Sequence, residues 1–141
     1  CGAFWAPRGL ESPTANPMKD AKPARVSKVE NIHDGVFTTT SVTTFHKANL
    51  APLFESLRAQ AGLTRGWGDC YGHMLVATGR AEAMVDPQMN AWDCAALKPI
   101  VEEAGGTFTD LKGSPTIHGG NALSTNGKVF QQVMGIIRAA K

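Results

Sequence analysis

The feature that most constrains the fold of this chain is an alternation of short strand-like segments with helical segments, which continues to the last residues. A strand is predicted where a run of β-branched or apolar residues is bounded by glycine, proline or polar residues. These runs are Arg25–Glu30, Gly35–Thr40, Ala83–Asp86, Thr107–Asp110 and Ala122–Thr125. The segments predicted as helices are His46–Ala61, Cys70–Gly79, Trp92–Ala104 and Val129–Ala140. The alternation predicts an α/β fold in which helices flank a mixed sheet in layers.

The segment His46–Ala61 shows the helical pattern most clearly. Its apolar residues recur three and four positions apart between Leu50 and Ala61, which places them on one helix face. Gly62 then predicts the end of the helix. The following segment, Thr64–Gly68, is short and is predicted as a turn.

Length and composition exclude several classes of protein. The 141 residues are enough for one domain with its own core. The 43% hydrophobic and 18% charged residues are typical of a folded globular chain. A net charge of +2, without a lysine or arginine cluster, argues against nucleic-acid binding. No apolar stretch approaches the roughly 18 residues that a membrane span needs.

The N-terminal stretch CGAFWAPRGL has neither the basic leader nor the apolar region of a signal peptide. Three cysteines form no even-numbered disulfide framework, which favours a reducing compartment such as the cytoplasm. The chain starts without methionine inside an apparent structural element, so we expect it to be a fragment of a longer protein. Residues 7–24 are rich in proline, alanine, asparagine and lysine without periodicity, and are predicted as an exposed loop or arm.

The stretch WDCAALKPIVEEAGG, residues 92–106, places Asp93 at the start of a helix that ends at two glycines. One interpretation is a helix cap, because an early aspartate accepts backbone N–H bonds and favours the positive end of the helix dipole. The other is a metal ligand, since carboxylate oxygens suit Mg²⁺. A single carboxylate is not a site, so further ligands must come from elsewhere. Pro99 inside this helix predicts a kink near Ala95–Lys98 or a separate first turn.

Two more aspartates lie at predicted junctions between elements. Asp86 ends a strand, and ligands of open α/β sheets collect beyond the carboxyl ends of strands; the alternative is an aspartate that caps a turn before Pro87. In RGWGDC, residues 65–70, two glycines allow a ligand to approach the backbone, and the N–H groups of the following helix start suit an anion. Asp69 is either the N-cap of that helix or a partner for a cationic or hydroxyl group of a substrate.

The remaining chemically active side chains form no recognisable site. The four histidines show no paired metal spacing, and the three cysteines contain no CxxC. His73 lies in an apolar helix, where a histidine is more often a hydrogen-bonded core residue than a ligand. Ser41 and Ser124 lack a G-x-S-x-G context, which argues against a serine hydrolase.

Taken together, these residues resemble the C-terminal half of the inositol monophosphatase family. The resemblance depends on LVATGRAEAMVDPQMNAWDCAALKPIVEEAGGTFTDLKG, residues 75–113. This stretch is similar to the family signature W-D-x-A-A followed by I-V-x-E-A-G-G and a strand rich in threonine and aspartate. GAFW, residues 2–5, resembles the family's G-x-G-A-F stretch. The similarity implies that residues 1–141 are the C-terminal half of the inositol monophosphatase-like sugar phosphatase fold.

Within the family, the pattern is most similar to the histidinol-phosphate phosphatase branch, through WGDCYGH at 67–73 and LVATGRAEAMVDP at 75–87. Inositol monophosphatases tend to carry Gly-Ser/Thr-Ala-Ala at the first place and a glutamate near the position of Asp86. Here Asp69 and Asp86 replace those residues. Two carboxylates on the leaving-group side would suit a substrate that bears an amine and an imidazole.

The resemblance also implies residue roles in the Mg²⁺-dependent hydrolysis of a small phosphorylated metabolite. Asp93 matches a Mg²⁺ ligand of the family, whereas Asp86, Asp69 and Gly68 match substrate-side positions. Two further substrate-side candidates are Arg65, three residues before Gly68, and Ser41, which follows the strand TTT. No residue of this chain is assigned as a catalytic group.

The family's other metal ligands come from a glutamate pair and an Asp-Pro-x-Asp-Gly-Thr segment that both belong upstream of the half that this chain resembles, so these 141 residues do not supply them. We therefore expect the chain alone to be inactive and to need the N-terminal half, joined covalently or supplied as a separate chain. Without that half, we expect the sheet to have a bare apolar face. Pairing with that half or forming a homodimer, which is common in the family, would remove this surface from water.

Two other functions remain open. One is a catalytically inactive module that keeps the fold for assembly or for binding a phosphorylated metabolite, which the missing ligands favour for the isolated chain. The other is a different specificity within the family, for inositol monophosphates or bisphosphorylated nucleotides. The sequence upstream of Cys1 would distinguish the inactive module from a phosphatase. A phosphate-release assay that compares substrates would distinguish the other specificities from histidinol phosphate.

Overall fold

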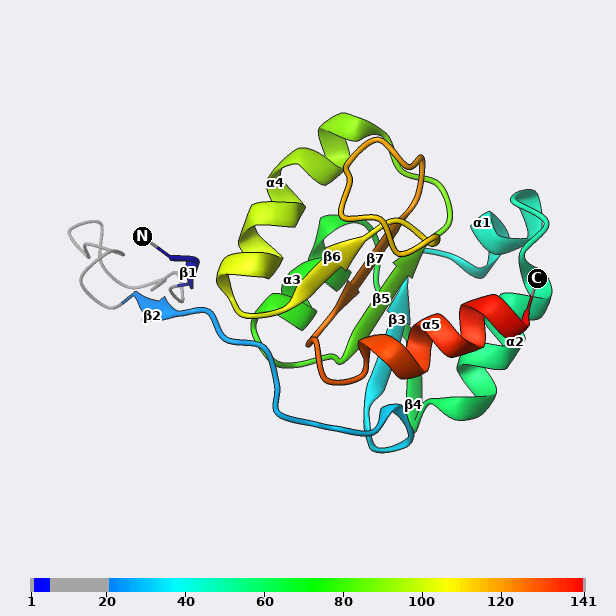
Figure 1. Ribbon diagram of the computed structural model, residues 1–141, viewed down its shortest axis with the longest axis horizontal. Helices are drawn as coiled ribbons and strands as arrows, with labels where there is room; N and C mark the ends of the chain where they lie inside the picture. Colours follow the sequence, from blue (N-terminus) through cyan, green and yellow to red (C-terminus); the bar gives the residue numbers. More distant parts are fainter. Residues whose placement is uncertain (1, 6–20, 141) are drawn as a thin grey trace, which may run out of the picture.

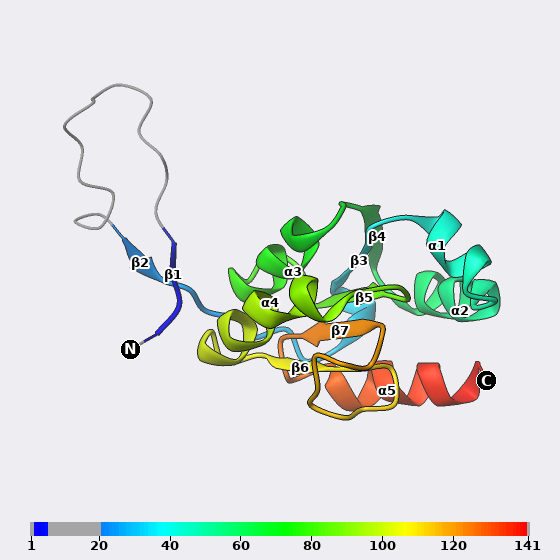
Figure 2. The same ribbon diagram turned by 90° about the horizontal axis from the view of Figure 1, so that it is seen from above.

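The computed structural model describes residues 2–5 and 21–140 (Figure 1). The predicted arm at residues 7–24 therefore lies largely outside the described residues. At its end, β2 (Lys22–Pro23) pairs antiparallel with β1 (Phe4–Trp5). Figures 1 and 2 show these two strands at the periphery of the main body. The residues that flank them, Ala3 and Ala24, are buried in the same apolar cluster as Cys94 and Leu97.

The main body is built on a mixed five-stranded sheet, which confirms the predicted fold class. The strand order is β4-β3-β5-β7-β6. The strand bounds are Val36–Thr39 for β3, Leu63–Gly66 for β4, Ala83–Asp86 for β5, Thr107–Thr109 for β6 and Ala122–Thr125 for β7. β3 is parallel to both β4 and β5, whereas β7 is antiparallel to both β5 and β6. The parallel pairs place the carboxyl ends of β3, β4 and β5 at one edge of the sheet.

Helices cover both faces of this sheet (Figure 2). They are α1 (Val42–Lys47), α2 (Ala51–Gln60), α3 (Cys70–Ala77), α4 (Ala91–Glu103) and α5 (Phe130–Ala139), with a 3₁₀ helix η1 (Ile32–Asp34). Because side chains alternate along a strand, Phe37, Val85 and Leu123 enter one core with α2 and α5. Met84 and Phe108 pack on the other face, against α3 and α4. The predicted bare apolar face is therefore wrong for the described residues, because the chain's own helices cover the sheet.

The predicted strand Arg25–Glu30 and the predicted turn Thr64–Gly68 are both corrected by the structure. Arg25–Glu30 belongs to no sheet, and its Val26 N–H donates instead to the carbonyl of Ala104, just after α4. The other segment contributes most of β4, which pairs with β3. The sequence showed neither result, because a strand exists only where a second strand lies in register to share hydrogen bonds.

The predicted helix His46–Ala61 is in fact two helices. α1 ends shortly before Asn49, whose φ of 56° lies in the left-handed region, and α2 begins with Pro52 in its first turn, where a missing N–H is tolerated. α4 instead runs through Pro99 without interruption, so its first turn is not separate; the kink stays a prediction. No helix among the described residues is long and apolar enough to cross a membrane.

Candidate functional site

A pocket of about 480 Å³ lies beyond the carboxyl ends of β3 and β5. Because these strands are parallel neighbours, the residues that end them lie side by side, and the N-terminal ends of α3 and α4 complete the walls. The lining residues are Thr40, Thr44, Asp69, Cys70, Asp86, Gln88, Met89, Asp93 and Leu97. The pocket thus lies where open α/β sheets bind ligands, and it contains the three aspartates that the sequence singled out.

Asp86, the last residue of β5, lies buried at this pocket. Its carboxylate is held by Thr40, whose backbone N–H donates to Oδ1 at 3.0 Å and whose hydroxyl donates to Oδ2 at 2.8 Å. The Nε2 atom of His73 lies 3.5 Å from Oδ2. Asp86 therefore bonds across to the end of the neighbouring strand, and among the described residues it does not cap the turn at Pro87. Donors on both oxygens fix the orientation of this carboxylate.

Asp69 immediately precedes α3, but its side chain makes no hydrogen bond that caps the helix. Its φ of 54° and ψ of −142° are values that residues with a Cβ rarely adopt. Its backbone N–H donates to the hydroxyl of Thr40 at 3.0 Å, so one threonine links the backbone of Asp69 to the carboxylate of Asp86. The N-cap interpretation is wrong for this side chain, and strain of this kind, of order 1–3 kcal/mol, is typical of functional sites.

Asp93 does cap its helix and also lines the pocket. Its Oδ2 accepts a hydrogen bond from the backbone N–H of Asn90 at 3.1 Å and from the Asn90 side-chain amide at 3.2 Å. Its Oδ1 has no hydrogen-bond partner within the part of the chain that the structure describes, and the residue is exposed. The two interpretations of Asp93 are therefore compatible, because the cap uses one oxygen and leaves the other for a cation or a substrate.

The pocket is acidic, since three carboxylates line it and none of the described lysine, arginine or histidine residues does. The charge affects Cys94, which is buried on α4: burial first, and then the negative charges of Asp93 and Asp86, raise the pKa of its thiol. Such a pocket attracts a metal ion or the cationic group of a ligand. A phosphate without a cation would be repelled.

The described residues do not complete a metal site. Within residues 2–5 and 21–140, no group of three or more histidine, cysteine, aspartate and glutamate side chains is placed to hold a metal ion. Mg²⁺ takes near-octahedral coordination by oxygen, usually with one or two carboxylates and several waters. The free oxygen of Asp93 fits one arm of such a site, and the other protein ligands would have to come from residues outside the described ones.

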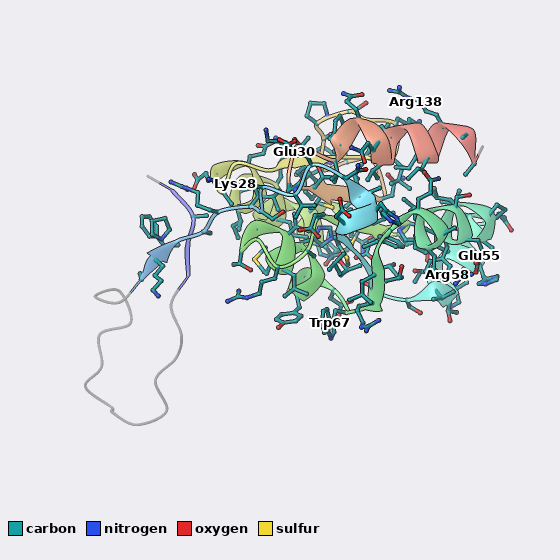
Figure 3. All side chains as sticks on the ribbon, turned by 90° about the horizontal axis from the view of Figure 1, so that it is seen from below. Lys28, Glu30, Glu55, Arg58, Trp67 and Arg138 are labelled. Atoms are coloured by element: carbon teal, nitrogen blue, oxygen red, sulfur yellow. The ribbon has the colours of Figure 1, made fainter. Side chains whose placement is uncertain are left out.

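Exposed aromatic side chains flank the two aspartates at the helix starts. Trp67 and Tyr71 meet edge to face with ring centroids 6.3 Å apart, and they are 44% and 57% exposed. Trp92, next to Asp93, is 76% exposed. Figure 3 shows Trp67 pointing outward, on the side of the molecule opposite Arg138 of α5. Aromatic faces beside carboxylates are suited to cationic ligands.

The other predicted substrate-side residues are not among the lining residues. A side chain at Gly68 would meet Thr40 Cγ2 at an ordinary distance of 3.6 Å, so no close approach requires glycine there. Ser41 is the N-cap of α1. Arg65 lies exposed on β4, and its guanidinium donates to the carbonyl of the preceding residue at 2.9 Å. The structure does not place these three residues in the pocket lining, and their roles remain predictions.

Sequence reasoning missed Thr40, the residue that connects Asp69 to Asp86. The available signal was its place at the end of a predicted strand, because the ends of parallel neighbours meet. His73 was predicted as a hydrogen-bonded core residue, which its full burial and its contact of Nδ1 with Ser124 Oγ at 2.7 Å confirm. Its position next to Asp86 was not foreseen, because it depends on how α3 packs on the sheet.

Comparison with known proteins is consistent across sequence and fold. Residues 3–140 match the model of the inositol monophosphatase family. A histidinol-phosphatase of Chlorobaculum parvum is 55% identical over 59% of this chain and 32% of its own length. Histidinol-phosphatases of Streptomyces coelicolor and Mycobacterium tuberculosis are each 33% identical, over 95% and 96% of this chain and 50% and 52% of their own lengths. The chain thus spans about a third to a half of these relatives.

Solved structures show the same fold. An inositol monophosphatase of Zymomonas mobilis superposes with a TM-score of 0.77 at 24% identity, over 83% of this chain and 47% of that one. The inositol monophosphatase of Anabaena superposes with a TM-score of 0.75 at 22% identity, over 96% of this chain and 54% of that one. At these identities the likeness concerns the fold, and it extends over most of the present chain.

Proposed function

Because this chain belongs to the inositol monophosphatase family, we propose that it is part of a cytoplasmic, Mg²⁺-dependent phosphatase that hydrolyses histidinol phosphate to histidinol in histidine biosynthesis. The proposal concerns the protein that contains the chain, since the curated relatives are two to three times as long as the matched region. The observation that carries the choice of substrate is the meeting of Asp69 and Asp86 at one pocket, through Thr40. These are the two positions at which the sequence departs from the inositol monophosphatase pattern, which the resemblance gives as Gly-Ser/Thr-Ala-Ala and a glutamate.

The substrate has a cationic end and an anionic phosphate end, and the pocket carboxylates can bind the cationic end directly. Histidinol phosphate carries an amine and an imidazole on the alcohol that leaves. Asp69, exposed at the rim, and Asp86, deeper in the pocket, offer carboxylates to these groups. A cationic group beside a partly buried carboxylate forms a charge-assisted hydrogen bond, which is stronger than a neutral one. Inositol phosphate offers only hydroxyl groups there.

The phosphate end requires positive charge that the pocket lining does not provide. In the reaction, a water oxygen bonds to phosphorus, the bond from phosphorus to the alcohol oxygen breaks, and the alcohol takes up a proton. Bound Mg²⁺ would neutralise phosphate charge and lower the pKa of a coordinated water. This chain offers Asp93 to such an ion, and the cap contact with Asn90 keeps that carboxylate in place.

The test of substrate choice uses the full product of the gene. Asp69→Ala and Asp86→Ala are expected to lower kcat/KM for histidinol phosphate more than for inositol phosphate, because only the first substrate presents cations to these carboxylates. The matched control is Asp34→Ala, an exposed aspartate on η1 outside the pocket lining. Equal losses on both substrates would contradict the proposed specificity.

The test of completeness compares the 141-residue chain with the full gene product. We expect no Mg²⁺-dependent phosphate release from the 141 residues alone, because the described part supplies too few metal ligands. Pairing with an N-terminal half, or a homodimer, remains part of the proposal. Phosphate release by the purified 141-residue chain would overturn it.

The second candidate is a catalytically inactive module that binds a phosphorylated metabolite, and the incomplete metal site of the described residues favours it. The two candidates differ in one measurement. An inactive module would bind histidinol phosphate in calorimetry without releasing phosphate, even as the full gene product with Mg²⁺ present. A preference for inositol monophosphate in the same assay would indicate the related specificity instead.

A further inference from the structure

His73 lies fully buried on α3, in the layer between this helix and the sheet. Its Nδ1 is 2.7 Å from the hydroxyl oxygen of Ser124 on β7. Its Nε2 has no hydrogen-bond partner within residues 2–5 and 21–140, yet lies 3.5 Å from Asp86 Oδ2. The ring of Phe108 packs nearby, with centroids 6.1 Å apart. A buried imidazole nitrogen without a partner is costly, so its place next to the pocket carboxylate calls for an explanation.

The chemistry of the neighbours determines where the imidazole proton lies. A carboxylate only accepts hydrogen bonds, whereas a serine hydroxyl both donates and accepts, and a neutral imidazole has one N–H. If the proton were on Nδ1, a lone pair of Nε2 would face Asp86 Oδ2 and repel it. The arrangement that avoids repulsion has the Ser124 hydroxyl donating to Nδ1 and the Nε2–H directed at Asp86.

We propose that His73 is a positioning residue, fixed by Ser124, that orients the Asp86 carboxylate for the cationic end of the substrate; the role of Asp86 rests on the proposed function. Thr40 holds both oxygens of Asp86 from one side. His73 acts on Oδ2 from a different element, α3. It therefore opposes rotation of the carboxylate about the Cβ–Cγ bond of Asp86. The same helix follows Asp69, so α3 connects the two substrate-side carboxylates. Small angular errors at such a group weaken substrate binding.

Two variants of similar size separate positioning from simple packing. In His73→Gln the amide nitrogen can occupy the place of Nε2 and donate to Asp86. In His73→Asn the shorter amide reaches the place of Nδ1 and contacts Ser124 only. We expect His73→Asn to raise KM for histidinol phosphate about tenfold with a smaller change in kcat, and His73→Gln to recover most of that loss. Equal KM values for the two variants, or a loss confined to thermal stability, would overturn the proposal.

A double-mutant cycle shows whether the effect passes through Asp86. If His73 acts only by orienting that carboxylate, His73→Asn adds no further loss of kcat/KM once Asp86→Asn is present. Inositol phosphate serves as the internal control, because its KM is expected to change less than threefold. Fully additive losses would mean that His73 acts elsewhere, and would overturn the inference.

A spectroscopic readout is independent of activity. Long-range ¹H–¹⁵N correlation spectra of the imidazole in the full chain are expected to show the Nε2–H tautomer, with a resonance that moves in Asp86→Asn. An Nδ1–H tautomer, or no response to Asp86→Asn, would overturn the proposal even if the enzyme is active. If the expected spectrum is found but no phosphate ester is hydrolysed, the proposed function fails while the contact between His73 and Asp86 stands.

Discussion

The face of the sheet that packs on α2 and α5 and the carboxyl ends of its central strands differ in polarity. Toward α2 and α5, the apolar side chains of the strands pack into a hydrophobic core, and Phe37, Leu57 and Val133 are almost completely buried. At the carboxyl ends of β3 and β5, the same strands lead to a pocket with three carboxylates and a strained backbone at Asp69. Next to its carboxylate Asp86 lies His73 Nε2, which has no hydrogen-bond partner in the part of the chain that the structure describes. The chain's own side chains fill the apolar core, whereas the carboxylates of the pocket attract a cation that is not part of the chain.

The comparison of core and pocket shows which part of the molecule stabilises the fold and which part lowers its stability. Burial of close-packed apolar side chains stabilises the fold, and a change in their volume lowers that stability. Like charges around one pocket repel each other, and the left-handed φ of Asp69 adds strain, so the site lowers the stability of the empty protein. Substitutions in the apolar core should therefore lower the free energy of unfolding. Substitutions at the pocket should instead weaken ligand binding or activity, with little loss or even a gain of stability.

The largest effect on folding is expected in the apolar core. Phe37→Ala should lower the free energy of unfolding by about 3–5 kcal/mol, because it removes a fully buried ring and leaves a cavity beside Phe54. Urea unfolding followed by circular dichroism measures the loss. Val42→Ala on α1, where the side chain is 41% exposed, is the control and should change stability by no more than about 0.5 kcal/mol. Similar losses for both would contradict the assignment of this core.

The largest effect on activity is expected at Asp93. Changes to groups that merely support a metal ligand cost about 10- to 100-fold, so Asp93→Asn should lower kcat/KM of the full gene product at least about 100-fold. The Mg²⁺ concentration for half-maximal activity should rise as well. Stability should change little, because asparagine can keep the contact with Asn90. Unchanged Mg²⁺ dependence would refute the metal-ligand role.

A gain of stability is expected at Asp69. Glycine adopts the observed φ of 54° without a Cβ clash, so Asp69→Gly should stabilise the fold by about 1 kcal/mol relative to Asp69→Asn. Both variants lose the charge and should bind histidinol phosphate equally weakly. Urea unfolding and calorimetry separate the two effects. A glycine variant no more stable than the asparagine variant would show that the backbone at Asp69 is not strained.

The smallest effect is a pH dependence at Cys94. Its pKa is raised in the folded state, so at alkaline pH the unfolded chain releases the thiol proton first, and stability falls as pH rises above about 8.5. The difference in unfolding free energy between the wild type and Cys94→Ala should therefore narrow between pH 8 and pH 10. A difference that stays constant or widens would contradict the raised pKa.

The sequence predicted the central strands more completely than the roles of the pocket residues. The strands Ala83–Asp86 and Ala122–Thr125 were predicted with the observed bounds, because their residue types and their boundaries agree. β4 was missed because LTRG has little strand character of its own and depends on pairing with β3. At the pocket, the three aspartates were predicted as candidates, but whether each served as a cap or as part of a site could not be decided from spacing.

The sequence by itself determined the alternation of strands and helices, the resemblance to the inositol monophosphatase family and the identity of the carboxylates. The tertiary structure decided that Thr40 and Asp86, 46 positions apart, share two hydrogen bonds. It also decided that His73 Nε2 lies 3.5 Å from Asp86 Oδ2. The physical reason is that local patterns fix which face of an element is apolar. Contacts between distant residues instead depend on which strands pair, in which direction and in which register.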